Sequence, residues 1–201
     1  MQKTAIFGGT FSPPHKGHIA MLRHLSSLKE IEKILIMPSK TPPHKTGKIL
    51  SAEHRVNMCR LAFSNIKKAE LDLSELNFSE KSYTLNTLKF LKEKGIENPI
   101  LVIGGDSLVD FHKWYKYEEI LKMCELMVYK RSSIDDNALL EAKKTLETLG
   151  GNIKILDFYP PNISSTEIRE KTLNGEDTKE IITPQIANYI KENGLYNGTD
   201  F

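Results

Sequence analysis

Short apolar runs alternate with longer amphipathic segments along this chain, and this alternation constrains its fold more than any other feature. Six apolar runs indicate strands, at residues 4–8, 33–38, 69–74, 99–105, 124–130 and 152–158. Helical periodicity predicts helices between and after them, at residues 17–28, 51–63, 84–95, 136–151 and 183–196. Strands that alternate with helices pair in parallel, because each helix carries the chain back across the sheet. The sequence therefore predicts an α/β fold with a doubly wound, mostly parallel sheet.

Composition narrows the class of protein. The chain has 201 residues, 39% of them hydrophobic and 27% charged, so we expect a single domain over residues 1–201 with one sizeable core. A formal net charge of +2 provides no overall field that would attract nucleic acid or a membrane surface. No apolar run approaches the ~18 residues of a membrane helix, and the first run is too brief for a secretory signal. We expect a cytoplasmic protein with Cys59 and Cys124 as reduced core thiols; the oligomeric state, including a homo-oligomer, stays open.

The most unusual segment is TAIFGGTFSPPHKGH at residues 4–18, where a predicted strand ends in two glycines. In a doubly wound sheet, ligands bind beyond the carboxyl ends of the strands. Gly8 and Gly9 would let a phosphate approach the backbone, since no Cβ stands in the way. The next helix opens at the end of this segment, and its N-terminus offers unpaired N–H groups to an anion. His15 and His18 add donors that can follow charge onto a transferring phosphoryl group.

Simpler interpretations of this segment compete with the phosphate site. Two glycines after a strand most often form only a tight turn. The spacing of His15 and His18 is weak evidence for zinc, because no further ligands follow at the spacing of a zinc finger. A P-loop is excluded, because the chain has no Gly-x-x-x-x-Gly-Lys-Ser/Thr segment.

A second segment, ISSTEIR at residues 163–169, follows the last predicted strand. Ser164 and Glu167 have the spacing of a capping box, so an ordinary helix start is one interpretation. Three hydroxyls and an arginine at one helix N-terminus also suit an anionic oligophosphate. The hydroxyls and N–H groups can bind its oxygens, and Arg169 supplies a bidentate fork.

Three further segments have both a local and a functional interpretation. IGGDSLVDFHKW at residues 103–114 contains a turn with a helix cap and the only tryptophan, Trp114, which by itself indicates packing. KSYTLNTL, at residues 81–88, opens a predicted helix. The loop PSKTPPHKTGKILS, at residues 38–51, is long for a compact domain, which is usual for functional loops. A solvated basic turn explains that loop equally well.

Taken together, these segments carry a family resemblance. GGTFSPPHKGH resembles the signature of the nucleotidyltransferase superfamily, and within it that of the nicotinate mononucleotide adenylyltransferase family. ISSTEIR looks like the second motif of that family without a substitution, and KSYT resembles its Ser-Tyr-Thr segment. Ser12 stands where the family usually has Asp, which removes a turn-capping carboxylate but keeps a hydroxyl. The closing segment ANYIKENGLY is also similar, so the resemblance covers essentially the whole chain.

The resemblance implies a fold, a Rossmann-like nucleotidyltransferase domain, and a set of site residues. It implies His15 and His18 as catalytic residues that stabilise the α-phosphate of ATP. ATP would be bound by Gly8, Gly9, Thr10, Phe11, His18, Gly104, Asp106, Ile163, Ser164, Ser165, Thr166 and Arg169. The mononucleotide would be bound by His44, Lys45, Tyr83, Thr84, Asp106, Trp114 and Tyr115, with the tryptophan stacked on the pyridine ring. The role of Arg131 stays open, because the proline that usually follows it in the family is absent.

The resemblance also implies a reaction: transfer of the adenylyl group of ATP to nicotinate mononucleotide, with deamido-NAD and pyrophosphate as products. Mg2+ would be bound through the ATP phosphates, and no protein ligand is assigned to it. The implied partners are small-molecule substrates.

Other functions share part of this pattern. Phosphopantetheine adenylyltransferases and cytidylyltransferases have a similar histidine motif, but KSYT and the Trp114 segment favour a pyridine nucleotide. Class I tRNA synthetases would need an anticodon-binding module and a second lysine motif, which this chain lacks. A non-catalytic nucleotide sensor is disfavoured by the two intact histidines.

Overall fold

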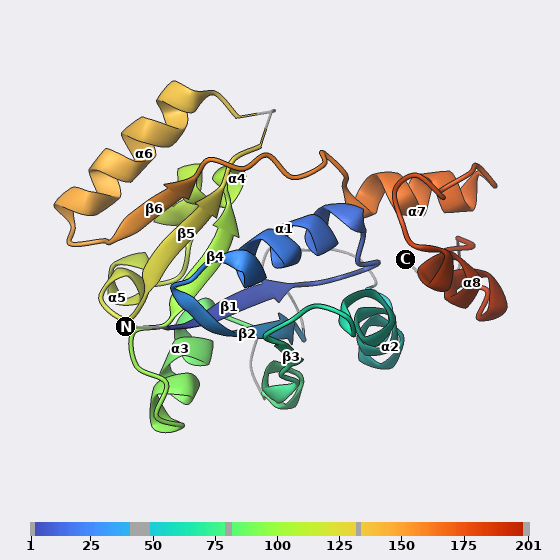
Figure 1. The fold of residues 1–201 in the computed structure, drawn as a ribbon, viewed down its shortest axis with the longest axis horizontal. Helices are drawn as coiled ribbons and strands as arrows, with labels where there is room; N and C mark the ends of the chain where they lie inside the picture. The colour runs from blue at the N-terminus through green and yellow to red at the C-terminus, as the bar shows by residue number, and fades with distance from the viewer. Residues whose placement is uncertain (1–2, 41–48, 79–81, 132–133, 199–201) are drawn as a thin grey trace.

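The computed structural model describes residues 3–40, 49–78, 82–131 and 134–198 (Figure 1). Its strands are β1 (Lys3–Gly9), β2 (Ile31–Pro38), β3 (Ala69–Leu71), β4 (Ile100–Gly104), β5 (Glu125–Tyr129) and β6 (Ile153–Leu156). Its α-helices are α1 (Lys16–Ser27), α2 (Ala52–Phe63), α3 (Thr84–Glu93), α4 (Gly105–Val109), α5 (Tyr117–Leu121), α6 (Asp136–Thr148), α7 (Ser165–Leu173) and α8 (Pro184–Glu192). Two 3₁₀ helices, η1 (Ser74–Asn77) and η2 (Phe111–Lys113), complete the described elements.

The six strands form one sheet in the order β3-β2-β1-β4-β5-β6. Every strand pair in it is parallel, so the predicted doubly wound fold is confirmed and the sheet is wholly rather than mostly parallel. The strand order reverses between β1 and β4, because the chain first builds outward from β1 to β3 and then returns to the other side of β1. Ligands bind at such a switch point in doubly wound folds.

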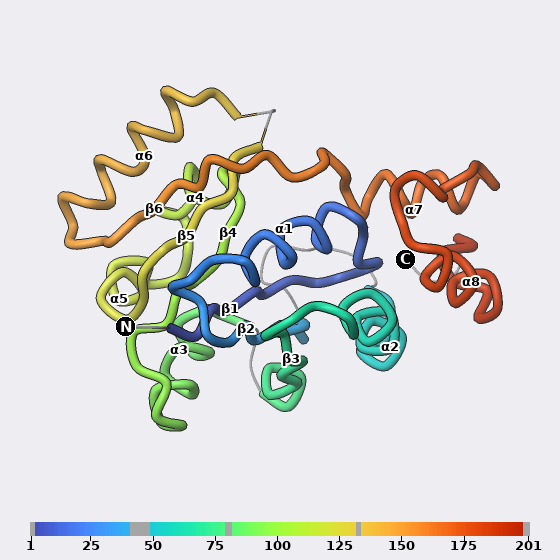
Figure 2. The backbone as a smooth tube through the Cα atoms, viewed as in Figure 1, coloured from blue at the N-terminus to red at the C-terminus, as the bar shows by residue number. Residues whose placement is uncertain are grey.

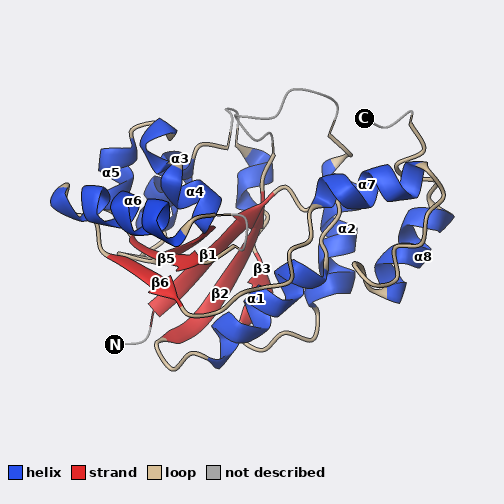
Figure 3. Ribbon diagram, turned by 90° about the horizontal axis from the view of Figure 1, so that it is seen from above, coloured by secondary structure: helices blue, strands red, loops and turns tan. Residues whose placement is uncertain are grey.

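Helices cover both faces of the sheet (Figure 3). On one face, α1 and α2 pack their apolar side chains against β1, β2, β4 and β5 in a buried cluster that includes Leu22 and Phe63. On the other face, α3 to α6 enclose a second cluster with Leu88 and Leu146. Continuous apolar strands are expected here, because each central strand is buried on both faces.

The last two helices lie beyond the end of the sheet (Figure 2). α7 and α8 form a third apolar cluster with α2, in which Ile168 and Ile186 meet Met58. This packing brings the segment after β6 back toward the carboxyl end of β1, where the first motif lies.

Local signals set most of the helix boundaries. Ser51, Asp135 and Thr183 accept hydrogen bonds from backbone N–H groups in the first turns of α2, α6 and α8, as N-caps do. Gly95 and Gly150 follow α3 and α6 with φ of 82° and 89°, so the predicted helices end before them. The sequence did not predict α4 and α5, because five residues are too few to show a helical period.

The two cysteines, Cys59 and Cys124, are free and buried, as predicted. Burial raises the pKa of each thiol to about 12. Among the described residues, no helix is both long enough and apolar enough to cross a membrane.

Candidate active site

A cavity of about 260 Å³ lies at the carboxyl ends of β1 and β4, where the strand order reverses. Its lining comes from β1, α1, the end of β2, η1, the start of α3, β4, α4 and the segments after η2 and β5. The lining residues are Phe7, Gly8, Gly9, His18, Met21, Ser39, Glu75, Ser82, Thr84, Leu101, Val102, Ile103, Gly104, Asp106, Ser107, Trp114 and Arg131. Seven of the residues predicted for the site are among them: Gly8, Gly9, His18, Thr84, Gly104, Asp106 and Trp114.

His15 and His18 form a reciprocal pair at the start of α1. The backbone N–H of His15 donates to Nδ1 of His18 over 3.2 Å, and the backbone N–H of His18 donates to Nδ1 of His15 over 3.4 Å. Their rings stack with centroids 3.6 Å apart. The two side chains therefore cap the helix that carries them, which holds both rings in one orientation.

The pair is electrostatically asymmetric. His15 is only 5% exposed, and burial, followed by the positive charge of Arg131, lowers its pKa to about 4. His15 is therefore neutral at pH 7. Because Nδ1 of His18 accepts a hydrogen bond, a neutral His18 carries its proton on Nε2, which makes Nε2 a donor.

The turn after β1 is fixed from inside the protein. Phe11 is buried with a φ of 50°, and its ring lies edge-on to His18 with centroids 5.2 Å apart. A Cβ on Gly9 would lie 2.8 Å from the same ring, so glycine is required for this close approach. The hydroxyl of Ser12, which stands where the family usually has Asp, lies 3.1 Å from the hydroxyl of Tyr196.

The second motif meets the first in space. Arg169 donates to the carbonyl oxygen of Ser12 over 3.0 Å, and the Ser165 hydroxyl donates to that of Pro13 over 2.9 Å. Ser164 caps α7 by accepting from the N–H of Glu167, which is one of the two bonds of a capping box. The remaining predicted members also lie here: Arg169 donates to the hydroxyl of Thr166 over 3.1 Å, and Ile163 packs against the third cluster.

Asp106 and Arg131 form an ion pair at the mouth of the cavity, with Nε and Oδ1 3.5 Å apart. Asp106 lies in the first turn of α4, directly after β4, and Arg131 follows β5. A Cβ on Gly104 would lie 2.4 Å from Oδ1 of Asp106, so this glycine lets the carboxylate fold back over the strand end. Arg131, whose role the sequence left open, thus belongs to the cavity and also acts on the pKa of His15.

Some of the residues predicted for the mononucleotide line the cavity, and others contact each other beside it. Thr84, at the start of α3, and Trp114 both line the cavity. The rings of Tyr83 and Tyr115 contact each other with centroids 4.9 Å apart, and the ring of Trp114 rests on Phe111 at the same distance. Two segments that are far apart in the sequence therefore form one aromatic surface. His44 and Lys45 lie outside the described residues.

Among the described residues, some predicted members stay outside the lining of this cavity. They are His15, Thr10, Phe11, Tyr83, Tyr115, Ile163, Ser164, Ser165, Thr166 and Arg169. His15 lies against His18, and the residues of the second motif adjoin the turn that follows Gly9. These residues support or flank the cavity instead of lining it.

Sequence reasoning missed a buried arginine. Arg55 is 1% exposed, and its guanidinium donates to the carbonyl oxygens of Leu50, Thr10 and Lys40 at 3.1, 3.0 and 3.4 Å. Burial lowers its pKa. One signal was available: Arg55 lies one helical turn before Cys59, on the face that the pattern marks as apolar.

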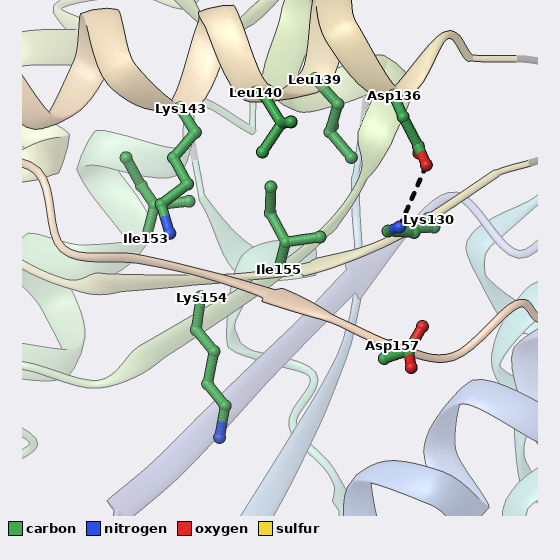
Figure 4. Close-up of a pocket in the computed structure, with 9 residues that line it drawn as sticks. All are labelled: Lys130, Asp136, Leu139, Leu140, Lys143, Ile153, Lys154, Ile155 and Asp157. Atoms are coloured by element: carbon green, nitrogen blue, oxygen red, sulfur yellow. Dashed lines mark hydrogen bonds and ion pairs between the residues drawn. The ribbon is translucent and has the colours of Figure 1, made fainter.

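The structure contains a larger hollow, of about 440 Å³, between α6 and the edge strand β6 (Figure 4). Leucine and isoleucine side chains form its apolar part, and Lys130, Lys143 and Lys154 surround them. Each lysine already has a carboxylate partner: Asp136, Glu147 and Glu30, respectively. Because these cations are paired, and because neither motif reaches this edge of the sheet, the candidate active site is the smaller cavity.

Comparison with known proteins agrees with this site. Residues 6–171 match the cytidylyltransferase-like family. A relative from Clostridium tetani, named "Probable nicotinate-nucleotide adenylyltransferase", is 36% identical over 98% of this chain and 100% of its own length. This chain belongs to the nicotinate-nucleotide adenylyltransferase family. A second relative of the same name, from Caldicellulosiruptor saccharolyticus, is 33% identical over 96% of this chain and 98% of its own. The family that the motifs indicated is thereby confirmed.

A solved structure shares the fold. The nicotinic acid mononucleotide adenylyltransferase of Plasmodium falciparum, complexed with NaAD, superposes with a TM-score of 0.79 at 22% identity and covers 98% of both chains. The same enzyme complexed with APC gives a TM-score of 0.77. The Rossmann-like nucleotidyltransferase fold predicted from the sequence is therefore confirmed over nearly the whole chain.

Proposed function

We propose that the protein transfers the adenylyl group of ATP to nicotinate mononucleotide, which makes deamido-NAD and releases pyrophosphate. The observation that carries the proposal is a single cavity at the switch point of the sheet, lined by His18, Thr84, Asp106 and Trp114. Donors for phosphate and an aromatic surface for a flat ring are thus present on one cavity. The names of the relatives support this choice of substrates.

In the proposed reaction, an oxygen of the mononucleotide phosphate attacks the α-phosphorus of ATP. A new P–O bond forms as the bond to the bridging oxygen of the β-phosphate breaks, and pyrophosphate leaves. No covalent nucleophile is needed, because catalysis consists of positioning two substrates and stabilising charge. Nε2 of His18 would donate to an oxygen of the α-phosphate as charge develops. Neutral His15 would act through His18, since it is buried against the ring of His18.

The remaining site residues are proposed to bind the two substrates. The glycine turn and the start of α7 would receive the phosphates of ATP, because both offer backbone N–H groups and lie together. Asp106 would accept from ribose hydroxyls, in exchange for part of its contact with Arg131. Trp114 would stack on the pyridine ring, supported from behind by Phe111.

Magnesium is proposed to be bound through the phosphates of ATP. Among the described residues, no group of three or more His, Cys, Asp or Glu side chains could hold a metal ion. The donors gathered at this site suit phosphate oxygens, which fits an ion that arrives with the nucleotide, and no protein ligand is assigned. When bound, Mg2+ would neutralise charge on the phosphate oxygens.

A comparison of nicotinate mononucleotide with nicotinamide mononucleotide tests which pyridine nucleotide the site accepts. Backbone N–H groups near Thr84 and Trp114 would satisfy both oxygens of a nicotinate carboxylate, whereas a nicotinamide NH₂ would face donors only. One unpaired buried polar group costs about 1–3 kcal/mol, so we expect a preference for the acid of roughly 5-fold to 160-fold in kcat/KM.

The experiment measures pyrophosphate release with ATP, Mg2+ and a panel of phosphate acceptors that includes both pyridine mononucleotides. A preference for the nicotinate compound supports the proposed function. Equal values, or a preference for the amide, would leave adenylyl transfer standing and reject the assignment of nicotinate as the preferred pyridine. If 4′-phosphopantetheine were the only acceptor in the panel to support pyrophosphate release, the proposed function with a pyridine mononucleotide would be rejected.

A further inference from the structure

A buried carboxyl group lies at the wall where the mononucleotide is proposed to bind. Glu75 lines the candidate active site and is only 8% exposed. It sits in η1, the short helix that follows β3. No sequence motif singled it out, and the proposed reaction gives it no role.

Two contacts dock η1 against α3. The hydroxyl of Thr87 donates to Oε1 of Glu75 over 2.5 Å, and the ring of Phe78 meets that of Phe90 edge-on with centroids 5.4 Å apart. Glu75 and Phe78 are three residues apart at η1, and Thr87 and Phe90 are three residues apart on α3. Each pair therefore lies on one face of its segment. The carboxyl and the aromatic ring therefore hold the two segments in a single register.

A second hydroxyl extends this contact to the end of β2. The pKa of the Glu75 carboxyl is raised mainly by burial, and hydrogen bonds from Thr87 and Ser82 oppose that rise, while Asp72 adds to it. Ser82 also accepts from the backbone N–H of Lys40 over 2.9 Å, and Nζ of Lys40 donates to the carbonyl oxygen of Phe78 over 2.6 Å. The contacts of Glu75 and Lys40 together thus connect three segments: the end of β2, η1 and the start of α3.

The start of α3 depends on this connection. Thr84 is the first residue of the helix and lines the cavity together with Ser82 and Trp114. Tyr83 precedes it, and its side chain makes no capping hydrogen bond. Thr87, whose hydroxyl donates to Glu75, follows Thr84 by three residues. This bond holds the first turn of α3 against η1, next to the residue that lines the cavity.

We propose that Glu75 is a positioning residue, which holds the start of α3 so that its backbone N–H groups face the pyridine carboxylate of the mononucleotide. The inference rests on the proposed function, because it concerns the same cavity. Its physical basis is geometric: a donor displaced by about 1 Å loses most of its hydrogen bond to a bound group. We expect a smaller effect on the ATP half of the cavity, around Gly9 and His18, because among the described residues Glu75 bonds α3 and not β1 or α1.

Thr87→Val provides the sharpest test. Thr87 is 2% exposed and is not among the described residues that line the cavity. Valine has a similar volume, so the substitution can affect the substrate only through the lost contact with Glu75. We expect KM for nicotinate mononucleotide to rise about 5-fold or more in Thr87→Val and about 10-fold or more in Glu75→Ala. In both variants, kcat and KM for ATP should stay within about two-fold of the wild type, as expected for lost ground-state binding.

Three comparisons complete the design. Glu75→Gln keeps one oxygen acceptor and should restore KM for the mononucleotide partly relative to Glu75→Ala. The double variant Glu75→Ala/Thr87→Val should be no worse than Glu75→Ala, because both changes break the same contact. Glu70→Gln, the same substitution on an exposed part of β3, should leave every constant unchanged.

The outcomes separate this inference from the proposed function. If the wild type does not use nicotinate mononucleotide, the proposed function fails. If the wild type is active but Thr87→Val and Glu75→Ala leave KM for the mononucleotide unchanged, the inference is wrong and the function stands. If KM for ATP rises equally, Glu75 has a general structural role and the inference is also wrong. Should Glu75→Ala fail to fold, Thr87→Val and Glu75→Gln decide the question.

Discussion

Arg169 donates a hydrogen bond of 3.0 Å to the carbonyl oxygen of Ser12, a residue 157 positions earlier in the chain. The bond joins the second turn of α7 to the turn that follows β1. Ser165 adds a parallel bond to the carbonyl oxygen of Pro13. The two motifs that the sequence places near opposite ends of the chain therefore form one unit beside the cavity.

We predict that Arg169→Ala raises KM for ATP by about 10-fold or more, because the proposed charge-assisted fork to the outer phosphates would already be made in the ground state. KM for the mononucleotide should change little, as steady-state kinetics with each substrate varied in turn would show. Arg169→Lys keeps the positive charge but not the bidentate fork, so its KM for ATP should lie between those of the wild type and Arg169→Ala. Equal increases in both KM values would mean that Arg169 only holds the turn at Ser12.

His18→Ala should lower kcat by roughly 100-fold or more, which is the scale of losing one transition-state donor. Binding of ATP, measured by calorimetry, should weaken much less. His24→Ala serves as a matched control on the same helix, because His24 stacks on Phe158 away from the cavity lining. If His18→Ala kept the kcat of the wild type, His18 would not be a catalytic residue, and the histidine pair would serve only to cap α1.

The buried His15 predicts a loss of stability in acid. Its pKa is lowered from 6.5 to about 4 in the folded protein, so between these values the unfolded chain binds a proton that the folded protein does not. Stability is unaffected by His15 above pH 6.5 and falls as the pH drops from 6.5 toward 4, by up to roughly 3 kcal/mol. Denaturant unfolding across this range should show a shallower fall for His15→Gln. If the free energy of unfolding fell equally steeply with pH in both proteins, the lowered pKa of His15 would not be the cause.

Two adjacent glycines should respond differently to alanine. A Cβ on Gly9 would lie 2.8 Å from the ring of Phe11, whereas a Cβ on Gly8 has its nearest neighbour at 4.0 Å. Gly9→Ala should therefore lower the free energy of unfolding by about 1–3 kcal/mol, as overpacking does. Gly8→Ala should keep its stability and raise KM for ATP, because the methyl group would meet the phosphate. Thermal unfolding and kinetics on both variants check this, and equal stability losses would refute it.

Much of the fold was predictable from the sequence because its signals are local. Each strand lies in a short, mainly apolar run, and several long helices show a period and end signals, such as Gly95 and Gly150. The motifs at 4–18 and 163–169 also indicated chemistry and family, because a ligand that approaches the backbone demands particular residue types at fixed spacing. What the sequence determined by itself was therefore the strands and the long helices, the α/β class and the family.

Only the tertiary structure decided how these parts act on one another. The contacts of Glu75 with Thr87, of Arg131 with Asp106 and of Arg55 with Thr10 each join different segments of the chain. No local pattern encodes such a contact, because a charged residue in the sequence is expected to be solvated until the fold brings its partner beside it. For the buried Glu75 and Arg55, each remaining hydrogen bond is necessary, since an unpaired polar group is costly in the interior. The helix spacing near Arg55 hints at burial, but its partners depend on where the packed sheet brings the turn after β1.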